Sequence, residues 1–379
     1  MVLEEAKAQQ KAAKIDPDNY VLSVVIPCYN EKDTIEAIVD EVIKSPIAKK
    51  EIIVVDNCST DGTREILREK IEQKVALVLY NEKNIGKGGS LIRGFEAATG
   101  DIVVVQDADL EYDPVKDYPK LVQPILDGET QVVYGSRFIK ENHATGSPLN
   151  YVANKVLTSF SNMMTGLNVT DVETCYKTFS KDAIKSIQLV EHNFGFEPEV
   201  TGKIAQKGYS IKEVPVEYYP RPTSEGKKVK FRHGFLTLYC IVKYRNKTAV
   251  SKLLQQFLSY LIVGGTAALV EWGVFALFNE ILCLGWTPAT IIAFVLALAV
   301  NYVLGRVITF KKAAEKCAVK SDLLPVVLVS IVGLLLNLLL MAFFVELIGI
   351  GDMISKIICT GLVLIWNFMA RRVFIYNKE

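Results

Sequence analysis

Along residues 20–220, short runs of apolar residues alternate with longer segments in which apolar residues recur every three or four positions. The short runs are rich in Val and Ile and predict strands, some of them buried on both faces. They occupy residues 21–27, 51–56, 75–79, 102–105, 131–134 and 210–216. The helical spacing predicts helices over residues 31–44, 63–72 and 88–99. Repeated strand–helix–strand units favour a mostly parallel sheet with helices on both faces, so we expect an α/β fold.

The pattern changes at residue 257, where four long apolar segments begin to follow one another. They cover residues 257–278, 286–304, 323–347 and 354–369. A helix that spans a membrane needs about 20 such residues, within a range of about 17–25. Four segments in a row with few charges argue against buried helices of a soluble domain. We therefore expect an all-α domain of four transmembrane helices, which also accounts for the mean hydropathy of +0.24.

Basic residues lie on one side of these predicted spans. They precede the first segment, fill the connection between the second and third, and follow the fourth, whereas residues 279–285 and 348–352 contain none. Because Lys and Arg stay on the cytosolic side, we expect a multi-pass protein of the cell membrane with both termini and the α/β domain in the cytosol. Residues 234–244 are apolar with basic edges and predict a segment that lies in the membrane interface.

These patterns divide the chain into four parts. We expect an N-terminal extension at residues 1–20, an α/β domain at 21–233, an amphipathic linker at 234–252 and the four-helix domain at 253–379. Residues 1–16 are polar and are not expected to form a secretory signal. The seven cysteines include no CxxC pair, which argues against a zinc site or a disulfide framework. A net charge of +1 gives no reason to expect a nucleic-acid partner.

The most informative polar residues are Asp107 and Asp109, which follow the predicted strand at 102–105. Alternation along the chain directs both carboxylates to the same side, with Ala108 opposite. Ligands of parallel α/β sheets bind at the carboxyl edge of the strands, and paired carboxylates there suit Mg²⁺ or Mn²⁺ serving a bound phosphate. Glu111 continues the spacing and is a candidate third ligand, although acids that cap helices also occur at such positions. We therefore expect chemistry on a nucleotide diphosphate.

The first strand-to-helix turn argues against a dinucleotide-binding dehydrogenase. Residues 27–31 read PCYNE and lack the glycines that such enzymes need there. Glycines come later, in GKGG at residues 86–89. They suit a tight turn near a sugar or phosphate, or simply a turn at a helix start.

Five motifs in order resemble those of family 2 glycosyltransferases of the polyprenyl-phosphate sugar synthase type, which includes dolichol-phosphate mannose synthases. They are VVIPCYNE at residues 24–31, VVDNCSTDGT at 54–63, DAD at 107–109, GSRF at 135–138 and YPR at 219–221. The resemblance spans residues 21–233 and implies a GT-A catalytic domain. Where the family has an acidic pair, this chain has Asp56 followed by Asn57.

The resemblance also implies roles for individual residues. The implied nucleotide contacts are Pro27, Tyr29, Glu31, Asp56 and Ala108, and the implied metal ligands are Asp107 and Asp109. The Tyr29 ring can stack on a base, whereas an acid such as Glu31 in a first helical turn is also favoured by the helix dipole alone. The family often places acceptor-side residues in the blocks that hold Asp171, Thr174, Lys177, Glu197 and Glu199. A helix cap is the alternative role for Asp171.

Arg137, Arg221 and Lys227 are candidate catalytic residues that bind phosphate. A guanidinium group is a planar fork that grips a phosphate with two hydrogen bonds. Arg221 and Lys227 flank residues 222–226, which we expect to be a mobile loop. The alternative for each is a solvated surface charge, above all for Lys227, which has other lysines beside it.

The membrane half resembles a GtrA-like domain. Its matching residues are VGG at 263–265, then Asn301, Tyr302 and Arg306 at the end of the second segment, and Asn367, Phe368, Arg371 and Arg372 at the end of the fourth. The first two segments therefore resemble a weak internal repeat of the last two.

We expect the protein to transfer a hexose from a nucleotide-diphosphate sugar to a polyprenyl or dolichyl phosphate, inverting the anomeric carbon to give a β-linked lipid sugar. GDP-mannose is the preferred donor and UDP-glucose the alternative. A phosphate monoester has a second pKa of about 6, so the acceptor needs cations to position it and no general base. The metal would stabilise the departing diphosphate.

Two other interpretations remain open: a lipid-sugar flippase or scaffold with a non-catalytic transferase-like domain, and a hybrid in which one chain both makes the lipid sugar and helps to translocate it. The four helices are also candidates for subunit contacts in a homo-oligomer. A processive polysaccharide synthase is disfavoured because the chain has no Gln-x-x-Arg-Trp motif.

Overall fold

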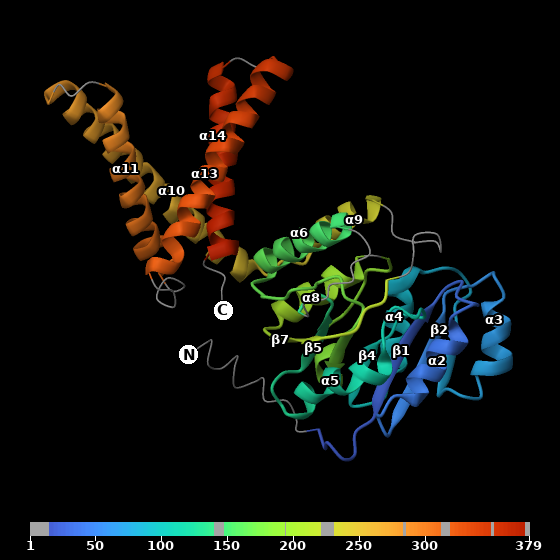
Figure 1. Ribbon diagram of the computed structural model, residues 1–379. Helices are drawn as coiled ribbons and strands as arrows, with labels where there is room; N and C mark the ends of the chain where they lie inside the picture. Colours follow the sequence, from blue (N-terminus) through green and yellow to red (C-terminus); the bar gives the residue numbers. More distant parts are fainter. Residues whose placement is uncertain are drawn as a thin grey trace. The chain divides into compact units, whose positions relative to one another are not determined.

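The computed structural model describes residues 15–139, 148–193, 195–220, 231–282, 286–311, 319–349 and 352–375. The chain divides into two compact units, Met1–Val250 and Ser251–Glu379. The first contains the sheet, and every element described in the second is a helix (Figure 1).

The first unit is built on a seven-stranded sheet in the order β3-β2-β1-β4-β6-β5-β7. The strands are β1 Leu22–Cys28, β2 Lys50–Asp56, β3 Leu77–Tyr80, β4 Ile102–Val105, β5 Val132–Ser136, β6 Lys177–Ser180 and β7 Ile211–Pro215. Every strand pair is parallel except the two that involve β6. The predicted mostly parallel sheet is confirmed. Strand β6 was not predicted, because its four residues carry only one large apolar side chain.

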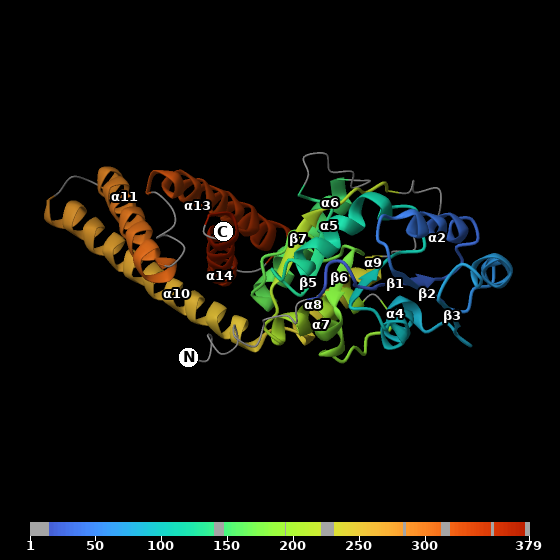
Figure 2. The same cartoon turned by 90° about the horizontal axis from the view of Figure 1, so that it is seen from below.

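Helices cover both faces of the sheet. The helices described in this unit are α2 Ile35–Lys44, α3 Thr63–Ile66 with the π-helical turn η1 Leu67–Ile71, α4 Gly86–Ala97, α5 Pro114–Leu126, α6 Pro148–Thr165, α7 Lys181–Lys185, α8 Phe196–Gln206 and α9 Phe231–Lys243. In Figure 2, α2 and α5 lie on one side of the strands and α4, α7 and α8 on the other. The predicted helix at 31–44 begins only at Ile35, because residues 31–34 form the turn that leaves β1.

The core lies between the strands and these helices. Helix α2 buries Ile35, Ile38, Val39 and Val42, the face that its spacing presents on one side. Helix α5 begins at a proline, and the side chain of Asp113 caps it by accepting a hydrogen bond from the Lys116 N–H. These local signals place β1, β2 and β4 in parallel register, so their carboxyl ends meet at one edge of the sheet.

Helices α6, α8 and α9 pack against one another in the first unit. Helix α9 contains most of the segment that the sequence predicted to lie in a membrane interface. One face of α9 buries Cys240 and Ile241, whereas Phe235 and Tyr239 are 64 % and 61 % exposed. Helix α6 exposes Leu149, Val152 and Val156. The segment is therefore a packed helix of the first unit with an exposed apolar face.

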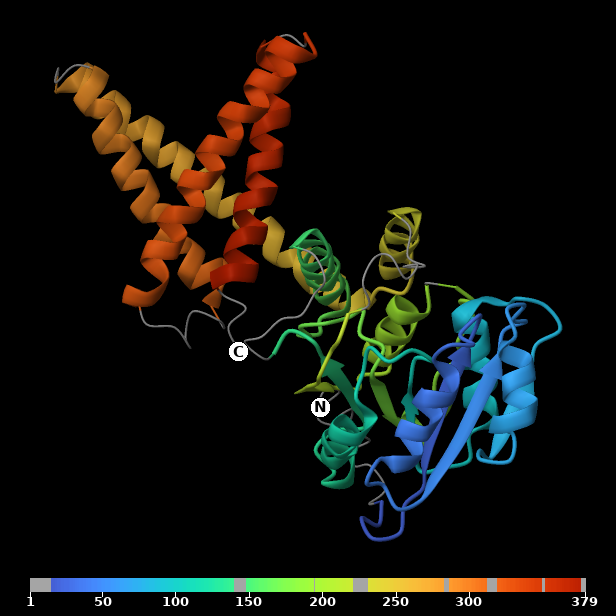
Figure 3. The ribbon, with the colours of Figure 1, turned by 45° about the vertical axis from the view of Figure 1, so that its right-hand side comes forward.

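The second unit repeats one succession of helices. Its described elements are α10 Lys247–Ala276, whose first four residues belong to the first unit, η3 Leu277–Ile281, α11 Trp286–Leu304, η4 Gly305–Thr309, α13 Val319–Ala342, η5 Phe343–Leu347, α14 Asp352–Ala370 and η6 Arg371–Ile375. Three of these elements have a counterpart that begins 66 residues later. Turn η3 at residue 277 corresponds to η5 at 343, helix α11 at 286 to α14 at 352, and turn η4 at 305 to η6 at 371. Helices α13 and α14 pack side by side (Figure 3).

The four apolar segments predicted to span a membrane fall on these helices. Within the described ranges, however, no helix is both long and apolar enough to cross a membrane.

Candidate functional site

The residues after β4 lie at the carboxyl edge of the sheet and are held there by a buried amide. Gln106 is fully buried, and its Oε1 atom accepts hydrogen bonds of 2.9 Å from the hydroxyls of both Tyr118 and Tyr176. The next residue, Asp107, has a side chain that is 25 % exposed. The strand end is therefore fixed at Gln106, and Asp107 lies at the edge of the protein interior.

Lys87 is the immediate partner of Asp107. Its Nζ atom lies 2.8 Å from Asp107 Oδ1 and 3.5 Å from Glu197 Oε1. Burial alone would lower the pKa of Lys87, but the charges of Asp107 and Glu197 raise it well above its ordinary value. Burial likewise opposes ionisation of Asp107, yet Lys87 holds the pKa of that carboxyl below its ordinary value. The glycines around Lys87 were singled out from the sequence, but the lysine was not. A cation between glycines at a helix start could have identified it as a candidate site residue.

The glycines of the 86–89 turn allow a close approach of two backbone segments. A Cβ atom on Gly88 would lie 2.1 Å from the carbonyl oxygen of Glu191, and one on Gly86 would lie 2.1 Å from that of His192. The N–H of Gly89 donates a 3.1 Å hydrogen bond to the same His192 carbonyl. The turn therefore does more than start a helix, because it brings Lys87 up to Asp107 and Glu197.

The predicted metal ligands are not assembled as a set of three. Glu111 Oε2 accepts a 2.9 Å hydrogen bond from the Tyr218 hydroxyl, and the Glu111 N–H donates to Asp109 Oδ1 at 3.2 Å. Within the described ranges, no group of three His, Cys, Asp or Glu side chains is placed to hold a metal ion. Two carboxylates nevertheless suit Mg²⁺ or Mn²⁺ when substrate phosphates supply further oxygens. Asp107 and Asp109 fit that donor set, and Glu111 has a protein partner instead.

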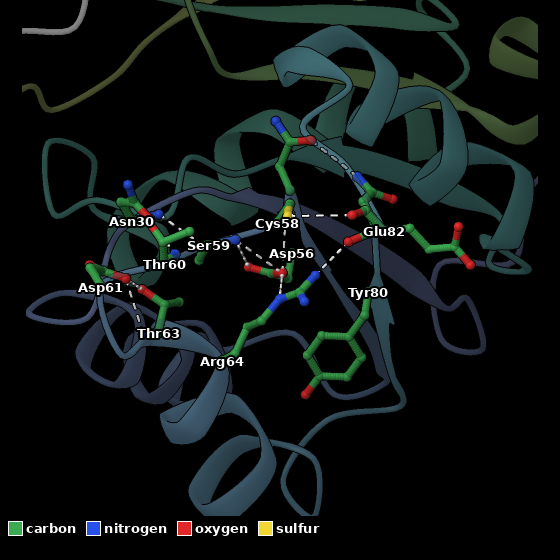
Figure 4. A network of polar contacts seen from close by, with 12 residues as sticks. Asn30, Asp56, Cys58, Ser59, Thr60, Asp61, Thr63, Arg64, Tyr80 and Glu82 are labelled. Carbon is green, nitrogen blue, oxygen red and sulfur yellow. Dashed lines mark hydrogen bonds and ion pairs between the residues drawn. The ribbon is translucent and has the colours of Figure 1, made fainter.

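Asp56 closes β2, lies close to Cys58, Ser59 and Arg64 (Figure 4), and is completely buried. Its carboxylate accepts hydrogen bonds from the N–H groups of Cys58 and Ser59 and a 2.6 Å bond from Arg64 Nε. Arg64 also donates to the carbonyl of Asn81. Asp56, a predicted nucleotide contact, thus already binds groups of the protein. Its hydrogen bonds shape the loop in which Cys58 has a left-handed φ of 63°.

Asn57, which departs from the acidic pair of the family, connects two loops. Its Nδ2 donates to Asn84 Oδ1 at 2.9 Å, and its Oδ1 accepts from the N–H of Ile85 at 2.8 Å. Residues 84 and 85 directly precede the glycine turn that carries Lys87. An ionised aspartate cannot donate the first of these bonds, so the amide has a specific structural use here.

Thr34 joins two of the predicted nucleotide-binding segments. Its hydroxyl lies 2.8 Å from Glu31 Oε2 and 2.9 Å from the carbonyl oxygen of Ala108. Tyr29, two residues before Glu31, is 36 % exposed at the end of β1. Pro27 lies within β1, in register with Val55. The structure therefore brings Glu31 and Ala108 together through Thr34, a residue that the sequence analysis did not single out.

Arg137 forms a buried ion pair with Asp171. Its Nε and Nη2 atoms donate to Asp171 at 2.7 and 2.8 Å, and its backbone N–H donates to the same carboxylate at 3.1 Å. Asp171 is fully buried and the Arg137 side chain is 13 % exposed. The guanidinium group of Arg137, which was expected to bind phosphate, thus binds the carboxylate of Asp171 instead.

Arg221 and Lys227 lie outside the described residues. The chain that leads to Arg221 is described as far as Pro220. The Tyr219 N–H donates a 2.8 Å hydrogen bond to the carbonyl of Glu111, and Tyr112 and Tyr218 form an antiparallel bridge. The segment that precedes Arg221 therefore runs beside the residues that follow Asp109.

The other predicted acceptor-side residues have internal partners. Lys177 is fully buried, and its Nζ donates to the carbonyls of Val172 and Thr174. Glu199 accepts hydrogen bonds from the N–H groups of Val190 and Glu191 and pairs with Lys203 at 2.7 Å. The contacts of Glu199 hold the loop that packs on the glycine turn, so Glu199 acts on the site through this loop.

Glu173 is an unexpected member of this region. Its Oε1 atom is buried without a hydrogen-bond partner. Burial, with the charge of Glu197 second, raises its pKa from 4.5 to about 7, although Lys177 and Arg137 act in the opposite direction. Nothing in the local sequence pattern distinguishes it from a solvated acid.

Replacing Glu173 by Gln is expected to flatten the dependence of stability on pH. Because the folded protein holds this proton to a higher pH than the unfolded chain, Glu173 makes stability fall as pH rises from about 4.5 to about 7. Thermal unfolding of the full chain in detergent at a series of pH values measures the effect, with Glu96→Gln at an exposed position as the control. An unchanged slope in Glu173→Gln would contradict the raised pKa.

Comparison with known proteins places these features in families. Residues 23–188 match the model of Glycosyl transferase family 2, and residues 259–376 match that of the GtrA/DPMS transmembrane domain. The chain is 27 % identical over 355 residues to a dolichol-phosphate mannosyltransferase of Pyrococcus furiosus, covering 90 % of this chain and 95 % of that protein.

Two further proteins are similar to part of the chain. The low-salt glycan biosynthesis hexosyltransferase Agl6 of Haloferax volcanii is 32 % identical over 206 residues, which cover 53 % of this chain and 48 % of that protein. The chain thus spans about half the length of that relative. A structure of glucosyl-3-phosphoglycerate synthase from Mycobacterium tuberculosis with Mn²⁺, UDP and glucosyl-3-phosphoglycerate is 24 % identical, with a TM-score of 0.46 over 63 % of this chain and 83 % of that one. From the family matches, the chain joins a family 2 glycosyl transferase domain to a GtrA/DPMS domain.

Proposed function

We propose that this protein transfers one hexose from a nucleotide-diphosphate sugar to a polyprenyl or dolichyl phosphate at a membrane surface. The observation that carries the proposal is the grouping of Asp107, Lys87 and Glu197 at the carboxyl edge of the parallel sheet. The match to a dolichol-phosphate mannosyltransferase over 95 % of its length supports a lipid phosphate as acceptor and mannose as the sugar. GDP-mannose is the preferred donor, and UDP-glucose is the alternative.

The donor would lie across the ends of β1, β2 and β4. Tyr29 is exposed there and offers a ring for the base, while Thr34 holds the Glu31 carboxylate beside the Ala108 carbonyl. Asp107 and Asp109 would hold Mg²⁺ or Mn²⁺, which when bound neutralises the departing diphosphate. Lys87 brings a second positive charge to the same edge, and its contact with Asp107 keeps it there.

The acceptor requires positioning more than activation. A phosphate monoester is largely ionised at neutral pH because its second pKa is about 6, so no general base is needed for its attack. Arg221 and Lys227 are the proposed phosphate contacts. Arg137 contributes mainly through its ion pair with Asp171, which fixes the segment after β5. Direct displacement at the anomeric carbon would invert it and give a β-linked product from an α-linked donor.

A membrane location supplies the acceptor. The apolar side chains exposed on α6 and α9 suit contact with a lipid surface. The GtrA/DPMS domain is proposed to anchor the chain with its catalytic domain on the cytosolic side, as the distribution of Lys and Arg predicts. A flippase or scaffold with a non-catalytic first unit is the alternative.

An assay of the purified full chain in detergent tests the proposal. GDP-mannose and UDP-glucose are offered separately with a polyprenyl phosphate and Mg²⁺ or Mn²⁺, and the lipid product is identified by mass spectrometry. We expect a polyprenyl-phosphate hexose from one donor, predominantly from GDP-mannose. Absence of any lipid product, with translocation of a preformed lipid sugar in proteoliposomes, would favour the flippase instead.

A further inference from the structure

The second unit contains a buried guanidinium group that has only neutral partners. Arg371 is 5 % exposed. Its Nη1 donates to Asn301 Oδ1 on α11 at 2.8 Å, its Nη2 donates to Ser330 Oγ on α13 at 3.2 Å, and its Cζ lies 5.6 Å from the ring centre of Tyr260 on α10. One side chain thus touches the three other helices of the unit.

The charge of Arg371 has no carboxylate partner among the residues that the structure describes. Within the same part of the chain, its Nε atom is buried without an acceptor. A buried charge costs free energy unless it is paired and hydrogen-bonded. Asn301 and Ser330 supply only dipoles. The arrangement therefore has the chemistry of a cation that lacks its anion.

Other polar groups around Arg371 also lack a hydrogen-bond partner or have only a neutral one. Asn367 lies one helical turn before Arg371 on the same face, and its Oδ1 atom is buried without a partner. Because the oxygen and nitrogen of an amide are nearly interchangeable in position, Asn367 can instead present its N–H₂ group. The neighbouring Arg372 donates to Gln256 Oε1 at 3.0 Å, so a second guanidinium also has a neutral partner here.

The internal repeat indicates that Arg371 is not needed to close a helix pair. The equivalent position 66 residues earlier is Gly305, which begins the matching π-helical turn η4. A Cβ atom on Gly305 would have Arg371 Nη1 as its neighbour at 3.9 Å. One half of the repeat therefore forms its turn with no side chain at this position, and the glycine leaves room for the arginine of the other half.

We propose that Arg371, with Asn367 and Arg372, forms a binding site for the phosphate group of an amphiphile with a hydrocarbon chain. A guanidinium fork binds phosphate oxygens in pairs, and such charge-assisted bonds are stronger than those to Asn301 and Ser330. Rings pack beside the site, with Phe368 5.5 Å from Tyr260, 6.1 Å from Phe310 and 5.1 Å from Phe257 between centroids. An apolar wall next to a cation suits a lipid phosphate better than inorganic phosphate.

Native mass spectrometry of the full chain in detergent tests this site. We expect Arg371→Gln to bind one polyprenyl phosphate fewer per chain than the parent. We expect Arg371→Lys to bind the lipid at this site at least tenfold more weakly, because an ammonium group lacks the planar fork of a guanidinium group. Lys252→Gln, which removes an exposed charge from α10, is the control and should bind as the parent does.

Two results would overturn the inference. They are an unchanged lipid count in Arg371→Gln and equal occupancy by inorganic phosphate. The thermal midpoint of Arg371→Gln should not fall, because removal of an unpaired cation leaves no orphaned acid, and this readout separates lost binding from lost folding. The choice of polyprenyl phosphate as the probe rests on the proposed function. The lipid count is read without a sugar donor, so a chain that transfers no sugar can still show the Arg371-dependent binding.

Discussion

Asp107→Asn and Asp109→Asn are each expected to reduce hexose transfer by a factor of about 10² to 10³, the typical cost of removing a group that stabilises developing charge at a preorganised site. Both carboxylates follow the buried strand β4 at the edge where parallel strands end. Asparagine keeps the size of the side chain and removes the charge that attracts a divalent cation. Transfer to polyprenyl phosphate by the full chain, with and without added Mn²⁺, is the measurement.

A matched control comes from the other end of the same strand. Asp101 precedes β4, is exposed and accepts a hydrogen bond from the Val21 N–H. Asp101→Asn should retain parental transfer. Nucleotide binding by calorimetry should increase with Mn²⁺ in the parent and much less in Asp107→Asn. Equal metal dependence in the two proteins would mean that Asp107 serves only to hold Lys87, and the metal role would be wrong.

Asp171→Ala is expected to destabilise the first unit by about 3–5 kcal/mol, because it leaves the buried guanidinium of Arg137 without its charge partner. The pair is bidentate, with distances of 2.7 and 2.8 Å, and Asp171 is fully buried. Hydrogen exchange of peptides from β1, β4 and β5, measured on the full chain, reports the opening free energy of this unit alone.

Two comparisons isolate the buried pair. Glu36→Ala breaks the exposed pair with Lys70 at 2.7 Å and should cost no more than about 1 kcal/mol. The double variant Arg137→Met with Asp171→Leu should recover much of the loss, because it removes both charges together. If Asp171→Ala were no more destabilising than Glu36→Ala, the ion pair would not support the segment after β5.

Much of the candidate site was predictable because its signals are local. The run of Val and Ile before Asp107 identified a buried strand, and the alternation of strands and helices placed its end at the binding edge of a parallel sheet. The motifs around Asp56, Asp107 and Arg137 indicated a family 2 glycosyltransferase, and the family match confirms it. The long apolar segments likewise gave the helices of the second unit and its repeat.

The partners of these residues could not be read in the same way. Lys87 pairs with Asp107, Arg137 with Asp171, and Arg64 with Asp56, and each ion pair joins different segments of the fold. Such pairings depend on which loops approach one another and on how far each charge is removed from water, and neither is a property of a short stretch of sequence. Periodicity and composition therefore determined the elements, the position of the site and the family. Only the tertiary structure decided which charges neutralise each other, that β6 runs antiparallel, and that Arg371 is buried against the neutral side chains of Asn301 and Ser330.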